Sequence, residues 1–502
     1  MTQRRRSSES QLAFPTSPDE RGVYCNRTLN LHTIRAIGYD MDYTLIHYKV
    51  DEWEGRAYAY IKDKLLSIGW PVEDLEFKPS EVIRSLILDT KHGNTLKVDR
   101  FGYVKRAAHG TRPLEFSEQR EIYARKLIDL REDRYEFLNT LFSLSEAWMF
   151  GQLVDLLDAG TLPADLRYED IYRTVKASTD EAHMGGRLKA DIIADPDRFV
   201  VLDPETPLAL LDQRRAGKKL LLITNSEWEY SSPMMEYSFD RFLPDDMTWR
   251  DLFDVIIVSA RKPSFFSATG PLFQVVSEDG LLKPCPGGIQ DDGVYLGGNA
   301  RHVEDYLGLS GDEILYVGDH MLTDVHITKN ILWWRTALIV RELETDLADA
   351  KTFREDQKQL ADLMLEKEGL ESELSRLRLD LQRKKQDYGP NLEMSKKDLD
   401  KLIGGVRRKL SSLDRKIRPF AEAAAAIGNP RWGPLMRAGN DKSFLARQVE
   451  RYADIYLSRV SNFLKLTPYA YLRSHRGSLP HDPQEVALVA DGEEGQEMEQ
   501  RV

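Results

Sequence analysis

Two aspartates, Asp40 and Asp42, follow a short apolar run and have the spacing of a reactive carboxylate pair. The run from Ile34 to Gly38 is typical of a buried strand. Side chains alternate between the two sides of a strand, so carboxylates two residues apart point the same way. Such a pair can hold a divalent cation and present one oxygen as a nucleophile. The alternative is a helix cap or an acidic turn, which two acids alone do not exclude.

Three more apolar runs end in polar residues that suit the same chemistry. The runs 220–223, 255–258 and 314–318 are followed, in that order, by Thr224, Asn225 and Ser226, by Lys262, and by Asp319 and Asp324. Taken singly, the hydroxyls and Asp319 could cap helices, and the lysine could be a solvated loop charge. Together, the four runs predict a mostly parallel sheet with one site at the carboxyl ends of its strands.

The four segments resemble, in the same order, the four motifs of the haloacid-dehalogenase (HAD) superfamily of phosphoryl-transfer enzymes. The resemblance implies an α/β fold with a HAD-like doubly wound parallel sheet and an inserted cap. It also implies that Asp40 attacks phosphorus to form an aspartyl-phosphate. Asp42 would protonate the leaving alkoxide and then act as base on water. An acid at this second position favours a phosphatase or phosphomutase over a carbon–halogen hydrolase.

The same resemblance implies Mg²⁺, because the incoming phosphate and the nucleophile are both anionic. The expected metal site consists of Asp40, the main-chain carbonyl of Asp42, Asp319, and Asp324 in an orienting role. Thr224 and Asn225 would hydrogen-bond the transferring phosphoryl group, and Lys262 would neutralise its charge.

Beyond the superfamily, the chain resembles the cytosolic purine 5′-nucleotidases that prefer IMP and GMP. The matching segments are Asp89 to Asp99, Asn139 to Phe142, Asp319-His320, and Gln448 to Tyr456, together with Tyr43 in the first motif. The similarity covers roughly residues 30 to 480. It implies hydrolysis of nucleoside 5′-monophosphates, with phosphate transfer to a nucleoside acceptor as a second activity.

The family's base-binding residues match five cap positions. They are Phe142, Lys176, Asp180, His183 and Lys189. Phe142 would stack on the purine, although ordinary core packing is the alternative, and His183 could equally be a structural histidine. The chain departs from the family at Lys176, where the family has an arginine, and at Ser143, where it has an asparagine. Both departures bear on the preference for IMP and GMP.

Composition limits the remaining function classes. The 502 residues carry a formal net charge of −12, which argues against binding nucleic acid through a broadly basic surface. The chain has 2 cysteines, without a zinc or disulfide pattern, and no apolar run long enough to span a membrane. The first residues lack the apolar core of a secretory signal. We therefore expect a cytoplasmic protein without a membrane or nucleic-acid partner.

The chain divides into six predicted segments. We expect disordered tails at 1–25 and 480–502, a catalytic core at 26–46 and 220–343, and a mostly helical cap at 47–219 with a hairpin near His92. Residues 344–420 are expected to form a helical hairpin. Residues 421–479 are expected to form a helical segment on the core or at a subunit interface.

The predicted hairpin has an apolar stripe along each arm. The stripe residues are Leu360, Leu363, Leu370, Leu374, Leu377 and Leu381 on the first arm, and Leu399, Leu402, Val406, Leu410, Leu413 and Ile417 on the second. Lys367 occupies one position of the seam, and Gly389-Pro390 ends the first arm. That arm would be roughly 60 Å long at 1.5 Å per residue. The hairpin is either an oligomerisation or partner arm, or it packs on its own body.

The sequence thus favours a Mg²⁺-dependent 5′-nucleotidase that assembles as a homo-oligomer, a dimer or a tetramer. One alternative is a HAD phosphatase that acts on another phosphate monoester. A second is an interaction scaffold built on a nucleotidase fold.

Overall fold

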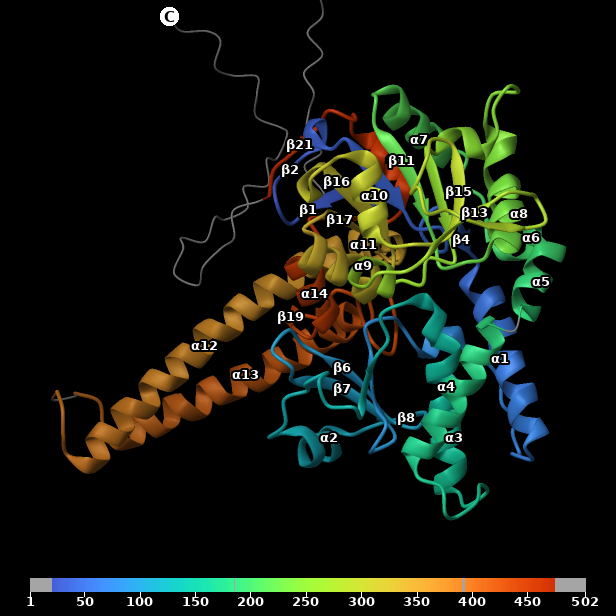
Figure 1. The fold of residues 1–502 in the computed structure, drawn as a ribbon. Helices are drawn as coiled ribbons and strands as arrows, with labels where there is room; N and C mark the ends of the chain where they lie inside the picture. The colour runs from blue at the N-terminus through green and yellow to red at the C-terminus, as the bar shows by residue number, and fades with distance from the viewer. Residues whose placement is uncertain (1–19, 185, 391–392, 475–502) are drawn as a thin grey trace, which may run out of the picture.

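A ten-stranded sheet forms the centre of the molecule (Figure 1). The computed structural model describes residues 20–184, 186–390 and 393–474. The strand order is β1-β20-β17-β16-β3-β11-β12-β15-β13-β14. The strands from β20 to β15 are parallel, β1 and β13 pair antiparallel with β20 and β15, and β14 pairs antiparallel with β13. The bounds are β1 Val23–Cys25, β3 Ala36–Tyr39, β11 Lys219–Ile223, β12 Val255–Val258, β13 Leu272–Val275, β14 Leu282–Pro284, β15 Gly293–Gly297, β16 Ile314–Gly318, β17 Arg335–Ile339 and β20 Ile455–Leu457.

Helices cover both faces of this sheet, which confirms the predicted doubly wound α/β fold. Helices α7 (Thr206–Arg215) and α8 (Trp228–Phe239) contribute to the larger apolar cluster on one face. Helices α9 (Ser264–Ser267) and α10 (Ala300–Leu307) contribute to the cluster on the other. Because the central strands are buried on both faces, they are continuously apolar rather than alternating.

A glycine in β3 sets the spacing between the two central strands. A Cβ atom at Gly38 would lie 2.8 Å from the ring of Tyr316 on β16, which is closer than packed carbon atoms approach. The absence of a side chain therefore lets the Tyr316 ring lie directly against β3. The hydroxyl group of Tyr316 accepts a hydrogen bond from Lys262, which lies in the loop that follows β12.

The chain leaves the core along one short strand and returns along another, and these two strands pair with each other. Strand β4 (His47–Tyr48) pairs with β10 (Val200–Val201), and the cap lies between them. Its helices are α1 Val50–Ser67, α2 Phe116–Tyr123, α3 Leu144–Asp158, α4 Tyr168–Met184, α5 Arg187–Ala194 and α6 Pro196–Phe199. The cap also has a five-stranded sheet of order β8-β7-β6-β5-β9, with bounds β5 Ile87–Asp89, β6 Asn94–Val98, β7 Val104–His109, β8 Arg112–Pro113 and β9 Tyr135–Phe137.

The cap sheet extends beyond the single hairpin that the sequence predicts. Strands β5 and β6 are that hairpin, joined by a turn at Gly93, whose φ of 64° suits glycine. Of the strands beyond that hairpin, β8 and β9 have only 2 and 3 residues, so they are too short to show a periodic pattern, whereas the 6 residues of β7 were not recognised as a strand. The cap is therefore less uniformly helical than expected.

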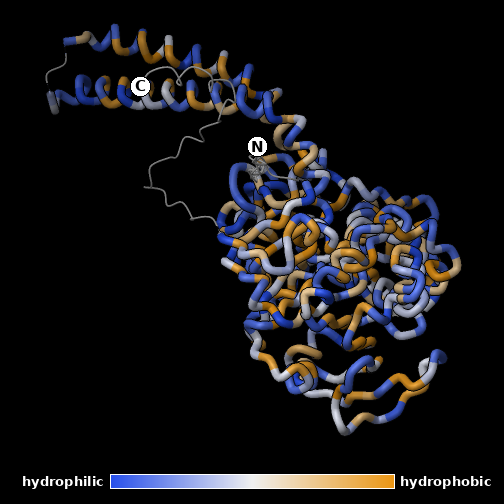
Figure 2. Tube along the Cα trace, turned by 90° about the horizontal axis from the view of Figure 1, so that it is seen from above, coloured by the Kyte–Doolittle hydropathy of each residue, from blue (hydrophilic) through white to orange (hydrophobic). Residues whose placement is uncertain are grey.

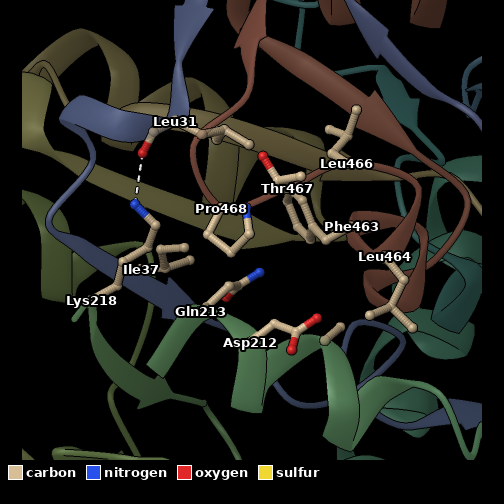
Figure 3. Close-up of a pocket in the computed structure, with 11 residues that line it drawn as sticks. Leu31, Ile37, Asp212, Gln213, Lys218, Phe463, Leu464, Leu466, Thr467 and Pro468 are labelled. Carbon is tan, nitrogen blue, oxygen red and sulfur yellow. Dashed lines mark hydrogen bonds between the residues drawn. The ribbon is translucent and has the colours of Figure 1, made fainter. Parts of the chain in front are cut away.

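The return to the core comes earlier than the predicted boundary at residue 219. Helix α7 packs on the core, and its Asp212 and Gln213 face Phe463 and Leu464 of the C-terminal region (Figure 3). A cavity of only about 10 Å³ remains between them, enough for about one water molecule. This pocket is too small for a nucleotide.

Residues 421–479, expected to be helical, differ most from the prediction. They include α14 (Phe444–Tyr452), but Ile455–Leu457 form strand β20 of the central sheet. Before α14 the chain lies across the cap. Asn429 donates to the Ser80 carbonyl over 2.8 Å, and Arg431 pairs with Glu81 over 2.6 Å. A three-residue strand and an irregular segment have no periodic pattern, so the sequence could not reveal either.

The helical hairpin extends away from the body (Figures 1 and 2). Helix α11 (Leu343–Thr352) is separated at Phe353 from α12 (Arg354–Gln386), which pairs with α13 (Lys396–Ala425). The 33 residues of α12 span about 50 Å, shorter than the predicted 60 Å, because the helix is interrupted. Lys367 lies 2.8 Å from Asp414 across the pair. Ile403 is buried in the seam, whereas Leu402 is exposed, so the stripe on α13 shifts by one residue there.

Part of the predicted N-terminal tail is ordered sheet. Val23–Cys25 form β1, which pairs with β20, so the prediction of disorder through residue 25 is wrong for this strand. Residues 1–19 and the expected tail at 480–502 lie outside the described residues. Among the described helices, none is both long enough and apolar enough to cross a bilayer.

Glu54 connects two cap helices without a counter-charge at hydrogen-bond distance. Its Oε2 accepts from the backbone N–H of Ser145 on α3 over 2.8 Å, and its Oε1 is buried without a hydrogen-bond partner among the described residues. Burial raises the pKa of Glu54 from 4.5 to about 7. The folded state therefore binds the proton more tightly than the unfolded state between these two values. This carboxyl group lowers stability as pH rises through that window.

We expect Glu54→Gln to remove that pH dependence. The amide keeps an acceptor for Ser145 but cannot ionise. Relative to wild type, the variant should gain up to about 3 kcal/mol in unfolding free energy between about pH 4.5 and about pH 8, with most of the gain before pH 7 is passed. Denaturant unfolding at several pH values measures the difference. Parallel pH profiles for the two proteins would contradict it.

Candidate active site

Four neighbouring strands bring the reactive residues to one edge of the sheet. Asp319 follows β16, Asp40 follows β3, Thr224 follows β11 and Lys262 lies beyond β12, and these strands are adjacent in the sheet. Carboxylate oxygens of Asp40, Asp319 and Asp324 lie within 4.8 Å of one another, and all three residues are buried. The sheet therefore brings together residues that are far apart in sequence.

Lys262 is the cation of this buried acidic cluster. Its Nζ lies 2.8 Å from Asp40 Oδ1 and 2.8 Å from Asp324 Oδ1, and it donates to the hydroxyl of Tyr316 over 3.2 Å. Burial alone would lower the pKa of Lys262, but attraction to Asp324 and Asp40 outweighs it and raises that pKa well above its ordinary value. The side chain is therefore a permanent cation.

The acids are held in a strongly desolvated environment. Burial raises the pKa of Asp40 to about 6, against the opposing attraction of Lys262. Burial, followed by repulsion from Asp324 and Asp40, raises the pKa of Asp319 well above its ordinary value. Three carboxylates thus share one ammonium group, an imbalance that favours a further cation.

The donor set fits a hard divalent cation. Asp319 Oδ2 is buried without a hydrogen-bond partner among the described residues, and an unpaired carboxylate oxygen is costly unless it binds something. Oxygen ligands of this kind suit Mg²⁺. In the described part of the chain, these three aspartates are the only group of histidine, cysteine and acidic side chains close enough to hold a metal ion. Only the main-chain carbonyl of Asp42 was expected at the metal, and its side chain is not part of this group.

Asp42 is held by hydroxyl groups. Tyr48 donates to Asp42 Oδ1 over 2.5 Å, and Ser226 donates to Asp42 Oδ2 over 2.7 Å. Tyr230 donates to the Tyr48 hydroxyl over 2.9 Å. Burial raises the pKa of Asp42, although Lys189 and these hydrogen bonds act in the opposite direction.

The second motif is organised around the loop of Lys262. The hydroxyl of Thr224 accepts from the backbone N–H of Ser226 over 3.1 Å. The side-chain amide of Asn225 accepts from the backbone N–H of Lys262 over 2.6 Å and donates to its carbonyl over 3.1 Å. In the ligand-free protein, the Asn225 side chain, which is expected at the phosphoryl group, therefore positions the lysine loop.

Two of the expected cap residues meet beside the first motif. The Phe142 ring packs edge-on against Tyr43, with centroids 4.7 Å apart, and against His183 at 5.7 Å. His183 Nε2 is buried without a hydrogen-bond partner among the described residues. Burial lowers the pKa of His183 to about 4, so the ring is neutral near pH 7. An aromatic ring and an imidazole nitrogen without a hydrogen-bond partner in the described ranges thus lie together beside Tyr43 of the first motif.

The other three cap residues make ion pairs. On α4, Lys176 lies 3.5 Å from Asp180 and 3.4 Å from the buried Glu146. Lys189 on α5 pairs with Glu227 and lies over the ring of Tyr230, 5.1 Å from its centroid. Lys189 therefore contacts α8 of the core through Glu227 and Tyr230, whereas Lys176 bridges the buried Glu146 and the exposed Asp180.

Sequence reasoning missed several residues that support the site. Tyr48 and Tyr230 are separated from each other by the whole cap, and nothing in their sequence context indicates a shared role. Arg84 gave no signal either. It is a fully buried cap side chain that donates to the Asp319 carbonyl over 3.1 Å and pairs with Glu342 over 2.7 Å. Ser226 was visible as a polar residue after β11, but its contact with Asp42 was not.

Comparison with known proteins gives a match over most of the chain. A family model described as the 5′ nucleotidase family matches residues 23–484. A 5′-nucleotidase domain-containing protein of Dictyostelium discoideum is 28% identical over 483 residues, covering 94% of this chain and 76% of that protein. The 5′-nucleotidase domain-containing protein 2 of Homo sapiens is 26% identical over 479 residues, covering 92% of this chain and 85% of that protein.

Solved structures give only distant likenesses. A predicted phosphoglycolate phosphatase from Haemophilus somnus has a TM-score of 0.28 and 12% identity, covering 61% of this chain and 86% of its own. The L-2-haloacid dehalogenase from Xanthobacter autotrophicus has a TM-score of 0.22 and 14% identity, covering 61% and 78%. Likenesses this weak carry no argument about function.

The family match extends over the core and the cap, and the four strand-end motifs that indicated the HAD superfamily lie on adjacent strands. The chain therefore belongs to the 5′ nucleotidase family and is a phosphoric monoester hydrolase.

Proposed function

We propose that this enzyme hydrolyses purine nucleoside 5′-monophosphates, with IMP and GMP preferred, in a Mg²⁺-dependent reaction through an aspartyl-phosphate on Asp40. The observation that carries the proposal is the buried carboxylate cluster with Lys262, together with the contact of Phe142 with Tyr43 of the first motif and with His183. The cluster suits transfer of a phosphoryl group, and the pair of rings suits a flat heterocycle.

Asp40 is assigned as the nucleophile. Its Oδ1 accepts from the Met41 N–H over 2.8 Å and contacts Lys262, which leaves Oδ2 to attack phosphorus. A bond from Oδ2 to phosphorus forms as the bond from phosphorus to O5′ breaks. Asp42 gives its proton to O5′ and then takes one from the water that releases inorganic phosphate. Mg²⁺ held by Asp40, Asp319 and the Asp42 carbonyl would reduce the repulsion between the anionic nucleophile and phosphate.

The cap is assigned the choice of base. Phe142 would stack on the purine, and the free Nε2 of neutral His183 would bind a donor or an acceptor on it. An acid such as Asp180 accepts from the protonated N1 of hypoxanthine or guanine but not from adenine, where N1 is itself an acceptor. In the ligand-free arrangement Asp180 pairs with Lys176.

A homo-oligomer, dimer or tetramer, remains a prediction that light scattering would test.

We expect phosphate release from IMP and GMP to require Mg²⁺ and Asp40. Chelation should abolish turnover, and Asp40→Asn should lower it by at least about a thousandfold, because an amide cannot act as the nucleophile. The measurement is release of inorganic phosphate from IMP, GMP, AMP, UMP and a set of sugar phosphates.

The matched control is Asp129→Asn, at an exposed aspartate paired with Arg131, which should leave turnover unchanged. Activity confined to sugar phosphates would keep the mechanism and move the substrate assignment. An unchanged rate in Asp40→Asn would exclude the proposed nucleophile.

We expect Lys176→Arg to increase the preference for IMP and GMP. A guanidinium can bind two acceptors in one plane, whereas an ammonium is a point charge. The substitution should raise kcat/KM for IMP by about three- to tenfold over that for AMP. Competition assays with both nucleotides measure the ratio. An equal change for IMP and AMP would contradict a role of this position in choosing the base.

We expect the phosphorylated enzyme to transfer its phosphoryl group to nucleosides as well as to water. A nucleoside that binds between Phe142 and the cluster would place its 5′-hydroxyl where water attacks. Incubation with IMP and labelled inosine in the presence of Mg²⁺ should give labelled IMP. Hydrolysis without any labelled IMP would reject the transferase activity and leave the hydrolase in place.

A further inference from the structure

A line of two tyrosine hydroxyl groups ends on one oxygen of the Asp42 carboxylate, and a serine hydroxyl binds the other. Tyr48 donates to Oδ1 and Ser226 donates to Oδ2, while the oxygen of Tyr48 accepts from the hydroxyl of Tyr230. Because Tyr230 supplies a proton to the Tyr48 oxygen, the single proton of Tyr48 is directed to Asp42. The order of donation is therefore Tyr230 to Tyr48 to Asp42 Oδ1.

Tyr48 cannot easily turn away from Asp42. It is buried in β4, at the crossing between core and cap. Its ring packs against Trp53, with centroids 4.3 Å apart, and edge-on against Tyr43 at 5.3 Å. Tyr230 is buried on α8, and Lys189 of the cap lies over its ring. Aromatic side chains with two fixed torsions make rigid donors in such a setting.

This arrangement bears on where the acidic proton of Asp42 can lie. A carboxyl group that accepts a hydrogen bond at Oδ1 from a fixed donor carries its own proton on Oδ2. The Ser226 hydroxyl can rotate to accept rather than donate, whereas Tyr48 is already committed as a donor. Tyr48 thus selects the oxygen that delivers the proton and holds the carboxyl plane in one orientation.

We propose that Tyr48, oriented by Tyr230, is a positioning residue that aims the carboxyl group of Asp42 at the leaving oxygen. The inference rests on the proposed function, in which Asp42 protonates O5′ as its bond to phosphorus breaks. Tyr48 itself neither gains nor loses a proton in that step. Its effect is confined to the reaction of substrates whose leaving group needs a proton.

A change of leaving group isolates this role. The probes are the nucleoside monophosphate that the wild-type enzyme hydrolyses fastest and its analogue with sulfur in place of the bridging O5′. A thiolate leaves without protonation, whereas an alkoxide does not, and both probes present the same base and sugar to the cap. Comparison of kcat/KM reports only the steps up to cleavage of the bond to phosphorus, so hydrolysis of the aspartyl-phosphate does not contribute.

Tyr48→Phe should lower kcat/KM for the natural nucleotide by about ten- to a hundredfold, as expected for loss of a hydrogen bond to a charged group. For the sulfur analogue the loss should stay below about threefold. Tyr230→Phe keeps the Tyr48 hydroxyl that donates to Asp42 but removes the hydrogen bond that orients this hydroxyl. It should give the same pattern with a smaller loss, and it serves as the second variant if Tyr48→Phe does not fold.

The matched control is Tyr295→Phe, at a fully buried tyrosine on β15 of the central sheet. Its hydroxyl accepts from the backbone N–H of Gln290 over 2.7 Å, near the start of β15 and away from the carboxyl ends of the strands. It should reduce stability without changing the ratio between the two probes. Equal losses on both probes in Tyr48→Phe, or no loss on either, would overturn the positioning role.

Asp40→Asn separates this proposal from the function on which it rests. Under the proposed function it abolishes turnover of both probes, whatever Tyr48 does. If Asp40→Asn retains activity, or if the wild-type enzyme hydrolyses no nucleotide, the proposed function fails and the role of Tyr48 fails with it. Loss of activity in Asp40→Asn with an unchanged probe ratio in Tyr48→Phe rejects only the positioning role.

Discussion

The buried ion pairs of Lys262 are the interactions on which the candidate site depends. Its ammonium group lies 2.8 Å from both Asp40 and Asp324, and Asp319 lies in the same cluster. Breaking a buried pair by removing one partner costs about 3–5 kcal/mol, because the other charge stays buried and unpaired. The loop after β12, which carries Lys262, is fixed by Asn225, whose side chain binds both the N–H and the carbonyl of Lys262.

The sheet makes this concentration of charge possible. Strands β16, β3, β11 and β12 are neighbours, so residues that follow them meet at one edge although they come from four distant parts of the chain. The strands are apolar on both faces, and their burial offsets the desolvation of the acids. Gly38 contributes by letting the Tyr316 ring lie against β3, from where its hydroxyl meets Lys262.

The cap is attached to the core at more than one place. The crossing of β4 and β10 carries Tyr48, which contacts Asp42. Arg84 reaches the carbonyl of Asp319, and Lys189 lies over Tyr230. The segment that follows the helical arm binds the cap through Asn429 and Arg431.

The sequence by itself determined the four strand-end motifs, the doubly wound sheet, the inserted cap and the helical hairpin. Each of these depends on local signals, namely apolar runs of strand length, leucines at helical spacing, and polar side chains at strand ends. The sequence did not reveal β1, β20 or β9, because strands of three residues have no measurable period.

Only the tertiary structure decided how the reactive side chains are held. Asn225 was expected at the phosphoryl group, but it binds the lysine loop, and Asp42 is held by Tyr48 and Ser226 rather than lying with the other acids. Which donor reaches which oxygen depends on the packing of strands and helices that are distant in sequence. The chemical role of a residue can therefore be predicted from the sequence where its neighbours along the chain indicate that role. Its partners appear only when the sheet and the cap have brought distant segments into contact.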